Sequence, residues 1–167
     1  MSEKQLESIR NLAEKIVSEC TKHGFKVTAA ESCTGGMIIA AITSISGSSA
    51  ATELGICSYS NRIKEDILGV SPKTLEKYTE YSTQCAAEMA KGVLKISGAD
   101  FSVSTSGVAG PTGGSEENPV GTVYIAVSGK GAVKTVKMNF DGDRDQVRIA
   151  ATEKALCMLL EEIEETE

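Results

Sequence analysis

The stretch Ala29-Ala30-Glu31-Ser32-Cys33-Thr34-Gly35-Gly36 joins a short run of strand-forming residues to an apolar helical run. We expect the strand to end at Ser32 and the helix to start at Gly35. The hydroxyls of Ser32 and Thr34 would then face the first N–H groups of the helix, an arrangement that binds anions and carries candidate nucleophiles. The alternative is that both side chains only cap the helix, as Ser and Thr often do.

The chain on either side of this stretch alternates between predicted helices and strands. A helix capped by Ser2 and closed by Gly24 comes before a strand over 25–30. The elements expected after it are a helix over 37–42, a strand over 53–59, a helix over 61–69, a short helix from Ser71-Pro72, a helix from Ser82 to Gly98, a strand over 101–105, a hairpin of strands over 122–127 and 133–140, and a helix capped by Asp143 and Gln146. This order predicts a mixed sheet covered by helices on both faces, a three-layer α/β/α sandwich in a single domain over 1–167.

Three of the predicted strands end in polar or glycine-rich sequence. These ends are Ser32 to Gly36, Tyr59-Ser60-Asn61 and Ser106-Gly107. Because ligands bind beyond the carboxyl ends of the strands in open α/β sheets, we expect the three to converge on one cleft. The last of them opens a glycine-rich loop that reaches Gly121, and loops of that length in a compact domain usually have a function.

A serine nucleophile needs a base, and the sequence offers few candidates. His23 is the only histidine and lies at a predicted helix end, so a Ser-His-Asp triad is nearly excluded. The amine of Lys64, if buried, would lose its proton readily and accept the proton of Ser32, with Tyr59 orienting or relaying it. The alternatives are an exposed helix lysine at 64 and, as a rival nucleophile, Cys33, which is otherwise a small buried residue.

Arg144 and Arg148 lie four residues apart near the start of the last predicted helix. This spacing places both guanidinium groups on one helix face, where they would clamp a phosphate or a carboxylate. The alternative is that they pair with Asp141, Asp143 or Asp145.

The overall composition limits the kinds of partner. A net charge of −6 and a pI of about 5.0 argue against nucleic acid. No apolar run is long enough to cross a membrane and the N-terminus lacks a secretion signal, so we expect a cytoplasmic protein. Five scattered cysteines without a Cys-x-x-Cys pair indicate reduced thiols, and no cluster has metal-ligand spacing, so no metal is expected. The apolar helix over 37–42 favours a homo-oligomer, most simply a dimer.

Four blocks of this sequence, in this order, resemble the CinA C-terminal domain family. The blocks are Ala30 to Gly36, Tyr59 to Val70, Gly107 to Val123, and Gly142 to Arg148. The resemblance covers nearly the whole chain. It implies hydrolysis of nicotinamide mononucleotide to nicotinic acid mononucleotide and ammonia, without a cofactor. Carried over residue by residue, it makes Ser32 the nucleophile, Lys64 its base and Tyr59 a helper. The residues expected to bind substrate are Cys33, Thr34, Gly35, Asn61, Ser106, Gly107, Gly110 and Arg144.

The chain departs from the family pattern at several positions. Ser106 stands where threonine is usual, and Thr112 replaces a glycine in the loop. Tyr81-Ser82-Thr83 replaces the more frequent Val-Ser-Glu, so an acidic contact is expected to be missing there. Larger family members carry a second domain associated with nucleotide pyrophosphatase activity. The alternative function is a non-catalytic module that binds nucleotides or protein partners in DNA uptake or damage responses.

Overall fold

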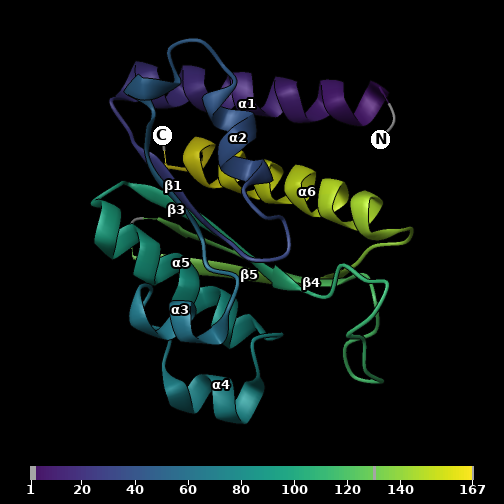
Figure 1. The fold of residues 1–167 in the computed structure, drawn as a ribbon. Helices are drawn as coiled ribbons and strands as arrows, with labels where there is room; N and C mark the ends of the chain where they lie inside the picture. The colour runs from purple at the N-terminus through teal and green to yellow at the C-terminus, as the bar shows by residue number, and fades with distance from the viewer. Residues whose placement is uncertain (1–2, 130, 167) are drawn as a thin grey trace.

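The computed structural model describes residues 3–129 and 131–166 and centres on a five-stranded sheet (Figure 1). The strands lie in the order β2-β1-β3-β4-β5. β1 pairs in parallel with β2 and β3, whereas β4 pairs antiparallel with β3 and β5. Their bounds are β1 (Val27–Glu31), β2 (Thr52–Cys57), β3 (Phe101–Gly107), β4 (Thr122–Gly129) and β5 (Ala132–Asn139). The predicted mixed sheet is therefore confirmed.

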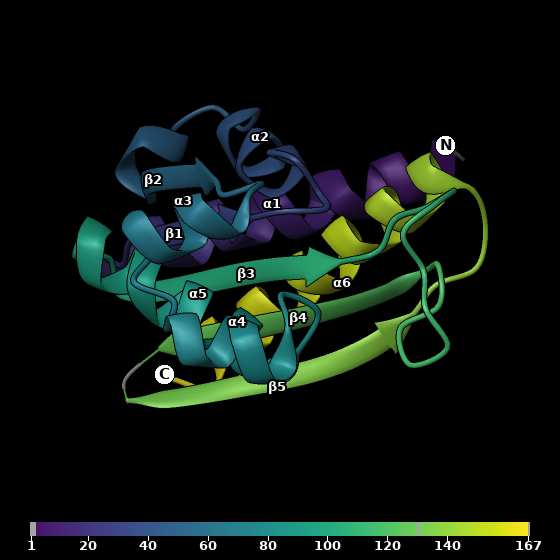
Figure 2. The same ribbon diagram turned by 60° about the horizontal axis from the view of Figure 1, so that its bottom comes forward.

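Helices cover both faces of the sheet, as Figures 1 and 2 show. One face carries α1 (Glu3–His23), α2 (Met37–Thr43) and α6 (Arg144–Glu164). The other carries α3 (Asn61–Asp66), α4 (Pro72–Tyr78) and α5 (Thr83–Ser97), and a 3₁₀ turn, η1 (Ser48–Ala50), precedes β2. This arrangement confirms the expected three-layer α/β/α architecture.

Local sequence signals set most of the element boundaries. Ser60 and Ser82 cap α3 and α5, and Asp143 forms the predicted capping box at the start of α6. β3 runs two residues further than predicted, because Ser106 and Gly107 still pair with β4. Ser2 and Lys130, which were expected in a helix cap and a hairpin turn, lie outside the described residues.

Helix α2 is only partly enclosed by this chain. Ile38 and Ile42 are buried against the core, but Ala40 is exposed. The buried face of this apolar helix meets the sheet, α1 and α6, and the opposite face is open in the single chain. Its assembly with a second copy stays a prediction.

The carboxyl ends of β1, β2 and β3 lie at one edge of the sheet, because the three strands are parallel neighbours. Figure 2 shows the arrows of β2 and β3 pointing to the same side, where the loop after β3 and the first turn of α6 also lie. Segments far apart in the sequence thus meet at this edge, and the candidate site lies there.

Candidate active site

Ser32 and Lys64 lie within hydrogen-bond distance at the carboxyl edge of the sheet. Ser32 is the first residue after β1, and its N–H donates to the Thr105 carbonyl of β3 at 3.0 Å. The Lys64 Nζ donates to the Ser32 Oγ at 3.1 Å and to the Ser58 carbonyl at 2.7 Å. Lys64 is only 1% exposed, so it is not the solvent-exposed helix lysine of the alternative interpretation.

Burial changes the acid–base properties of Lys64. Loss of hydration lowers the pKa of its ammonium from 10.5, and neighbouring ionisable groups offset this only in part. A neutral amine at this position can accept the proton of the Ser32 hydroxyl while it still donates to the Ser58 carbonyl. The pair therefore has the arrangement that a serine nucleophile and its general base require.

A small cavity of about 100 Å³ contains this pair. Its lining residues are Ser32, Cys33, Tyr59, Lys64, Glu80, Tyr81, Gly107, Ala109 and Arg144. Six of these were predicted as site residues, whereas Glu80, Tyr81 and Ala109 were not. Thr83 stands where the family more often has glutamate, and the carboxylate in the cavity comes instead from Glu80, at a different position. Glu80 lies outside the four blocks of sequence that resemble the family, so no motif signals it.

Tyr59 and Arg144 form the rim of the cavity. Arg144 donates from one guanidinium nitrogen to the Gly110 carbonyl at 2.8 Å and from another to the Tyr59 hydroxyl at 3.1 Å. Tyr59 is 66% exposed, and its hydroxyl accepts this hydrogen bond at the surface of the protein. Arg144 thus ties the loop after β2 to the glycine-rich loop, and a guanidinium group stands at the cavity entrance.

The N-terminus of α2 is occupied by a carboxylate of the chain itself. Glu31 is 1% exposed and accepts hydrogen bonds from the N–H groups of Gly36, Ile38 and Ile39 at 3.0–3.1 Å. It also accepts from the Thr34 hydroxyl at 2.6 Å. The expectation that these helix N–H groups face the Ser32 and Thr34 hydroxyls as an anion site is therefore wrong, because Glu31 already fills that position.

We predict that Glu31→Gln destabilises the fold by about 2–4 kcal/mol, because an amide nitrogen cannot accept the buried helix N–H groups. Urea-induced unfolding, followed by circular dichroism, measures this. Glu53→Gln, on the exposed side of β2, is the matched control and should change stability by less than about 0.5 kcal/mol. Equal unfolding midpoints for Glu31→Gln and the unchanged protein would contradict this account of the loop.

The two arginines that were predicted to clamp one anion have separate roles. Arg148 donates to the Cys33 carbonyl at 3.1 Å and to the Thr34 carbonyl at 3.2 Å, so it supports the loop that carries Ser32. Its Nη1 also lies 3.5 Å from the Asp145 Oδ1, and Asp145 is one of the three alternative partners named above. Of the pair, only Arg144 lines the cavity.

Five of the residues expected to bind substrate do not line this cavity: Thr34, Gly35, Asn61, Ser106 and Gly110. The Thr34 hydroxyl is buried and lies 2.7 Å from the Thr105 hydroxyl, and Gly35 is exposed beneath Arg148. Asn61 and Ser106 both hold the segment at Glu80, through its side chain and its backbone respectively. The structure therefore brings the serine, the lysine and the rim together, but not these residues.

Cys33 lines the cavity but is poorly suited to attack. It is 6% exposed, and burial raises the pKa of its thiol to about 11. The thiolate is the nucleophilic form, and at neutral pH very little of it would be present. The geometry favours Ser32 over Cys33.

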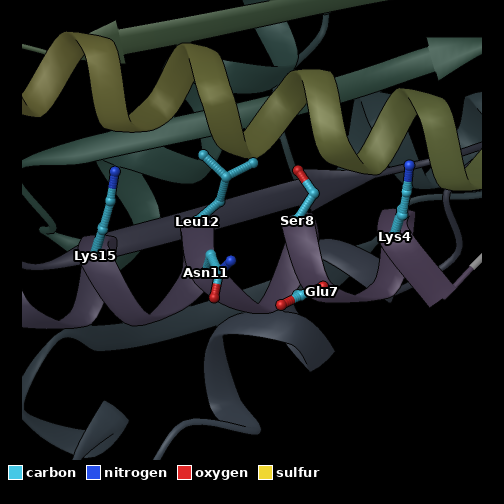
Figure 3. Close-up of a pocket in the computed structure, with 6 residues that line it drawn as sticks. All are labelled: Lys4, Glu7, Ser8, Asn11, Leu12 and Lys15. Atoms are coloured by element: carbon cyan, nitrogen blue, oxygen red, sulfur yellow. The ribbon is translucent and has the colours of Figure 1, made fainter.

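A separate hollow of the surface lies along α1. Figure 3 shows this hollow of about 360 Å³, where Lys4, Ser8, Leu12 and Lys15 point toward α6. All of its lining residues belong to this one helix. Over residues 3–129 and 131–166, no group of three His, Cys, Asp or Glu side chains is placed to hold a metal ion. Over the same ranges, no helix combines the length and the apolar character needed to cross a bilayer.

The sequence is similar to known proteins of one family. The model of the CinA C-terminal domain matches residues 9–163. A protein of Enterobacter agglomerans named nicotinamide-nucleotide amidohydrolase PncC is 50% identical over 163 residues, which cover 97% of this chain and 98% of that protein. A CinA-like protein of Shewanella pealeana is 43% identical over 92% of this chain, but the chain spans only 37% of its length.

Solved structures show the same fold. The competence/damage inducible protein CihA from Agrobacterium tumefaciens is 43% identical and superposes with a TM-score of 0.90, over 92% of this chain and 94% of that one. A CinA superfamily protein from Escherichia coli, 34% identical, gives a TM-score of 0.89 over 96% of this chain and 92% of that one. The chain therefore belongs to the CinA C-terminal domain family.

Proposed function

We propose that this protein is a nicotinamide-nucleotide amidohydrolase, which converts nicotinamide mononucleotide to nicotinic acid mononucleotide and ammonia. The observation that carries the proposal is the 3.1 Å contact between the buried Lys64 amine and the Ser32 hydroxyl. The name of the relative that is 50% identical over 97% of this chain supports the choice of substrate.

In the first half of the proposed reaction, the Ser32 Oγ attacks the carboxamide carbon while the neutral Lys64 amine accepts the hydroxyl proton. The Gly35 N–H already donates to the Ser32 carbonyl at 3.2 Å. We therefore place the donors for the tetrahedral oxyanion at the N–H groups of Cys33 and Thr34. The Lys64 ammonium then passes its proton to the departing amine, so ammonia leaves and an acyl-serine ester remains.

In the second half, water hydrolyses this ester. Lys64, now neutral, accepts a proton from the water that attacks the acyl carbon, and returns it to the Ser32 Oγ as the ester bond breaks. Nicotinic acid mononucleotide leaves, and the enzyme regains its first state. Arg144, at the cavity rim, is the proposed contact for the substrate phosphate. Tyr59, which binds Arg144, is proposed to orient that guanidinium group.

Ammonia release by the purified protein from nicotinamide mononucleotide tests the function directly. A coupled glutamate dehydrogenase assay measures ammonia, and chromatography identifies nicotinic acid mononucleotide in equal amount. Saturable binding of the nucleotide without either product would overturn the proposal and favour the non-catalytic module.

The proposed base makes the reaction depend on pH in a defined direction. Only neutral Lys64 accepts the serine proton, so kcat/KM should rise with pH along a single-proton acid limb. Burial lowers the pKa of Lys64 from 10.5, so the midpoint of this limb should lie below 10.5. Initial rates across the pH range in which circular dichroism reports a folded protein measure it. A flat acid side would contradict Lys64 as the base.

A further inference from the structure

The cavity contains a carboxylate that the mechanism above does not use. Glu80 lies in the loop between α4 and α5, and it is the only acidic residue among those that line the cavity. It shares the cavity with the Ser32 and Lys64 pair. In so small a site, a carboxylate attracts a positively charged ligand group and repels a negatively charged one.

Contacts from two other segments hold Glu80 in place. The Asn61 Nδ2 at the start of α3 donates to the Glu80 Oε2 at 3.3 Å. The Ser106 hydroxyl of β3 donates to the Glu80 carbonyl at 2.7 Å. Residues at the carboxyl edge of the sheet therefore hold both the side chain and the backbone of Glu80. Side chains that contact a ligand are usually positioned by supporting hydrogen bonds of this kind.

The backbone next to Glu80 is strained. Thr79 has φ 62° and ψ 176°, and it is the only described residue other than glycine with a positive φ. A β-branched residue rarely adopts this conformation, which costs of order 1–3 kcal/mol. The conformation is maintained by the Tyr81 N–H, which donates to the Thr79 hydroxyl at 3.2 Å, and by the Ser82 hydroxyl, which donates to the Thr79 carbonyl at 3.0 Å. A strained backbone conformation of this kind persists only where contacts with neighbouring groups hold the segment in place.

The cavity has an acidic, aromatic part and a basic rim. Tyr81 lines it together with Glu80, while Tyr59 and Arg144 stand at the rim. A carboxylate with aromatic rings nearby attracts a flat organic cation, and a guanidinium group attracts a phosphate. A pyridinium nucleotide carries these two charges at opposite ends, so its charges match the order of the groups in the cavity.

We propose that Glu80 is a specificity-determining residue that selects nucleotides whose nicotinamide ring is the positively charged pyridinium over those with an uncharged ring. The inference rests on the proposed function and adds the charge state of the substrate to it. The competing account is that Glu80 acts only on the charge of Lys64. It would then affect all substrates equally and shift the acid limb of the pH profile.

The test compares nicotinamide mononucleotide with its reduced dihydropyridine form, which has the same carboxamide and phosphate but no ring charge. Glu80→Gln keeps the size of the side chain and an oxygen that can accept from Asn61. Its kcat/KM for the cationic nucleotide should fall by about 10- to 100-fold, mainly through KM, and that for the reduced nucleotide by less than about 3-fold. The ratio between enzymes cancels the different intrinsic reactivity of the two amides. Glu76→Gln, exposed on α4, is the matched control and should keep the selectivity unchanged.

A binding measurement separates this inference from the proposed function. Calorimetry with Ser32→Ala, and with Ser32→Ala combined with Glu80→Gln, gives the affinity for both nucleotides without turnover. Glu80→Asp retains the charge and should recover part of the selectivity, and thermal unfolding verifies that each variant folds. The inference is overturned if Glu80→Gln leaves the preference for the cationic ring unchanged in binding and turnover, or lowers kcat equally for both nucleotides with a shifted acid limb. Absence of ammonia release from the unsubstituted protein overturns the proposed function alone, because the binding comparison still decides the role of Glu80.

Discussion

Replacement of Ser32 by alanine should lower kcat for ammonia release by at least about 10³-fold while the fold stays intact. The reason is chemical, because the substitution removes the hydroxyl that lies 3.1 Å from the Lys64 amine and is proposed to form the acyl intermediate. The Ser32 hydroxyl contributes little to the core, since the residue is only partly buried. Stopped assays with excess enzyme measure the residual rate.

Ser104→Ala is the matched control for Ser32→Ala. Ser104 lies on β3, outside the cavity lining, and its hydroxyl donates to the Ala86 carbonyl at 2.6 Å. This variant should lose stability by about 1 kcal/mol and keep kcat within a few-fold. A near-normal rate for Ser32→Ala, together with a large loss for Cys33→Ala, would move the nucleophile to the neighbouring thiol.

Replacement of Lys64 by methionine should reduce kcat/KM by about 10²–10⁴-fold, and the acid limb of the pH profile should disappear with the amine. Methionine has nearly the same length and fits an apolar environment, so it avoids the cavity that alanine would leave at a site only 1% exposed. The Ser58 carbonyl loses its 2.7 Å donor, so a modest loss of stability is expected as well. Rate measurements across pH, with circular dichroism to verify folding, separate the two effects.

Lys73→Met is the matched control for Lys64→Met. Lys73 is exposed on α4, so its loss should change neither kcat/KM nor the acid limb. If Lys64→Met kept the pH dependence of the unsubstituted protein, another group would have to supply the base, and the proposed reaction would lose its proton acceptor.

Local sequence patterns were sufficient for the order of the α-helices and strands, but not for the 3₁₀ turn at Ser48–Ala50. The alternation of apolar residues and the caps at Ser60, Ser82 and Asp143 set where the helices begin, because such signals act over a few residues. The order of helices and strands then led to the three-layer sandwich. The same reasoning identified the strand ends that meet at the cavity, since parallel neighbours present their carboxyl ends at one edge.

The roles of charged residues depended on contacts between distant segments. Lys64 and Ser32 are separated by 32 positions, and Arg148 and Cys33 by 115. A sequence pattern cannot predict whether a charged side chain such as Lys64 is buried or exposed, because burial depends on how the whole chain packs.

The amino-acid sequence by itself determined the order of the elements, the family and the segments that carry the candidate chemistry, because local propensity and spacing encode them. Only the tertiary structure decided that the Glu31 carboxylate fills the N-terminus of α2, that the Lys64 amine is enclosed, and that Glu80 reaches the cavity. The physical reason is desolvation. Charges and hydrogen bonds at this site depend on which groups are removed from water together, and the folded arrangement alone fixes that set.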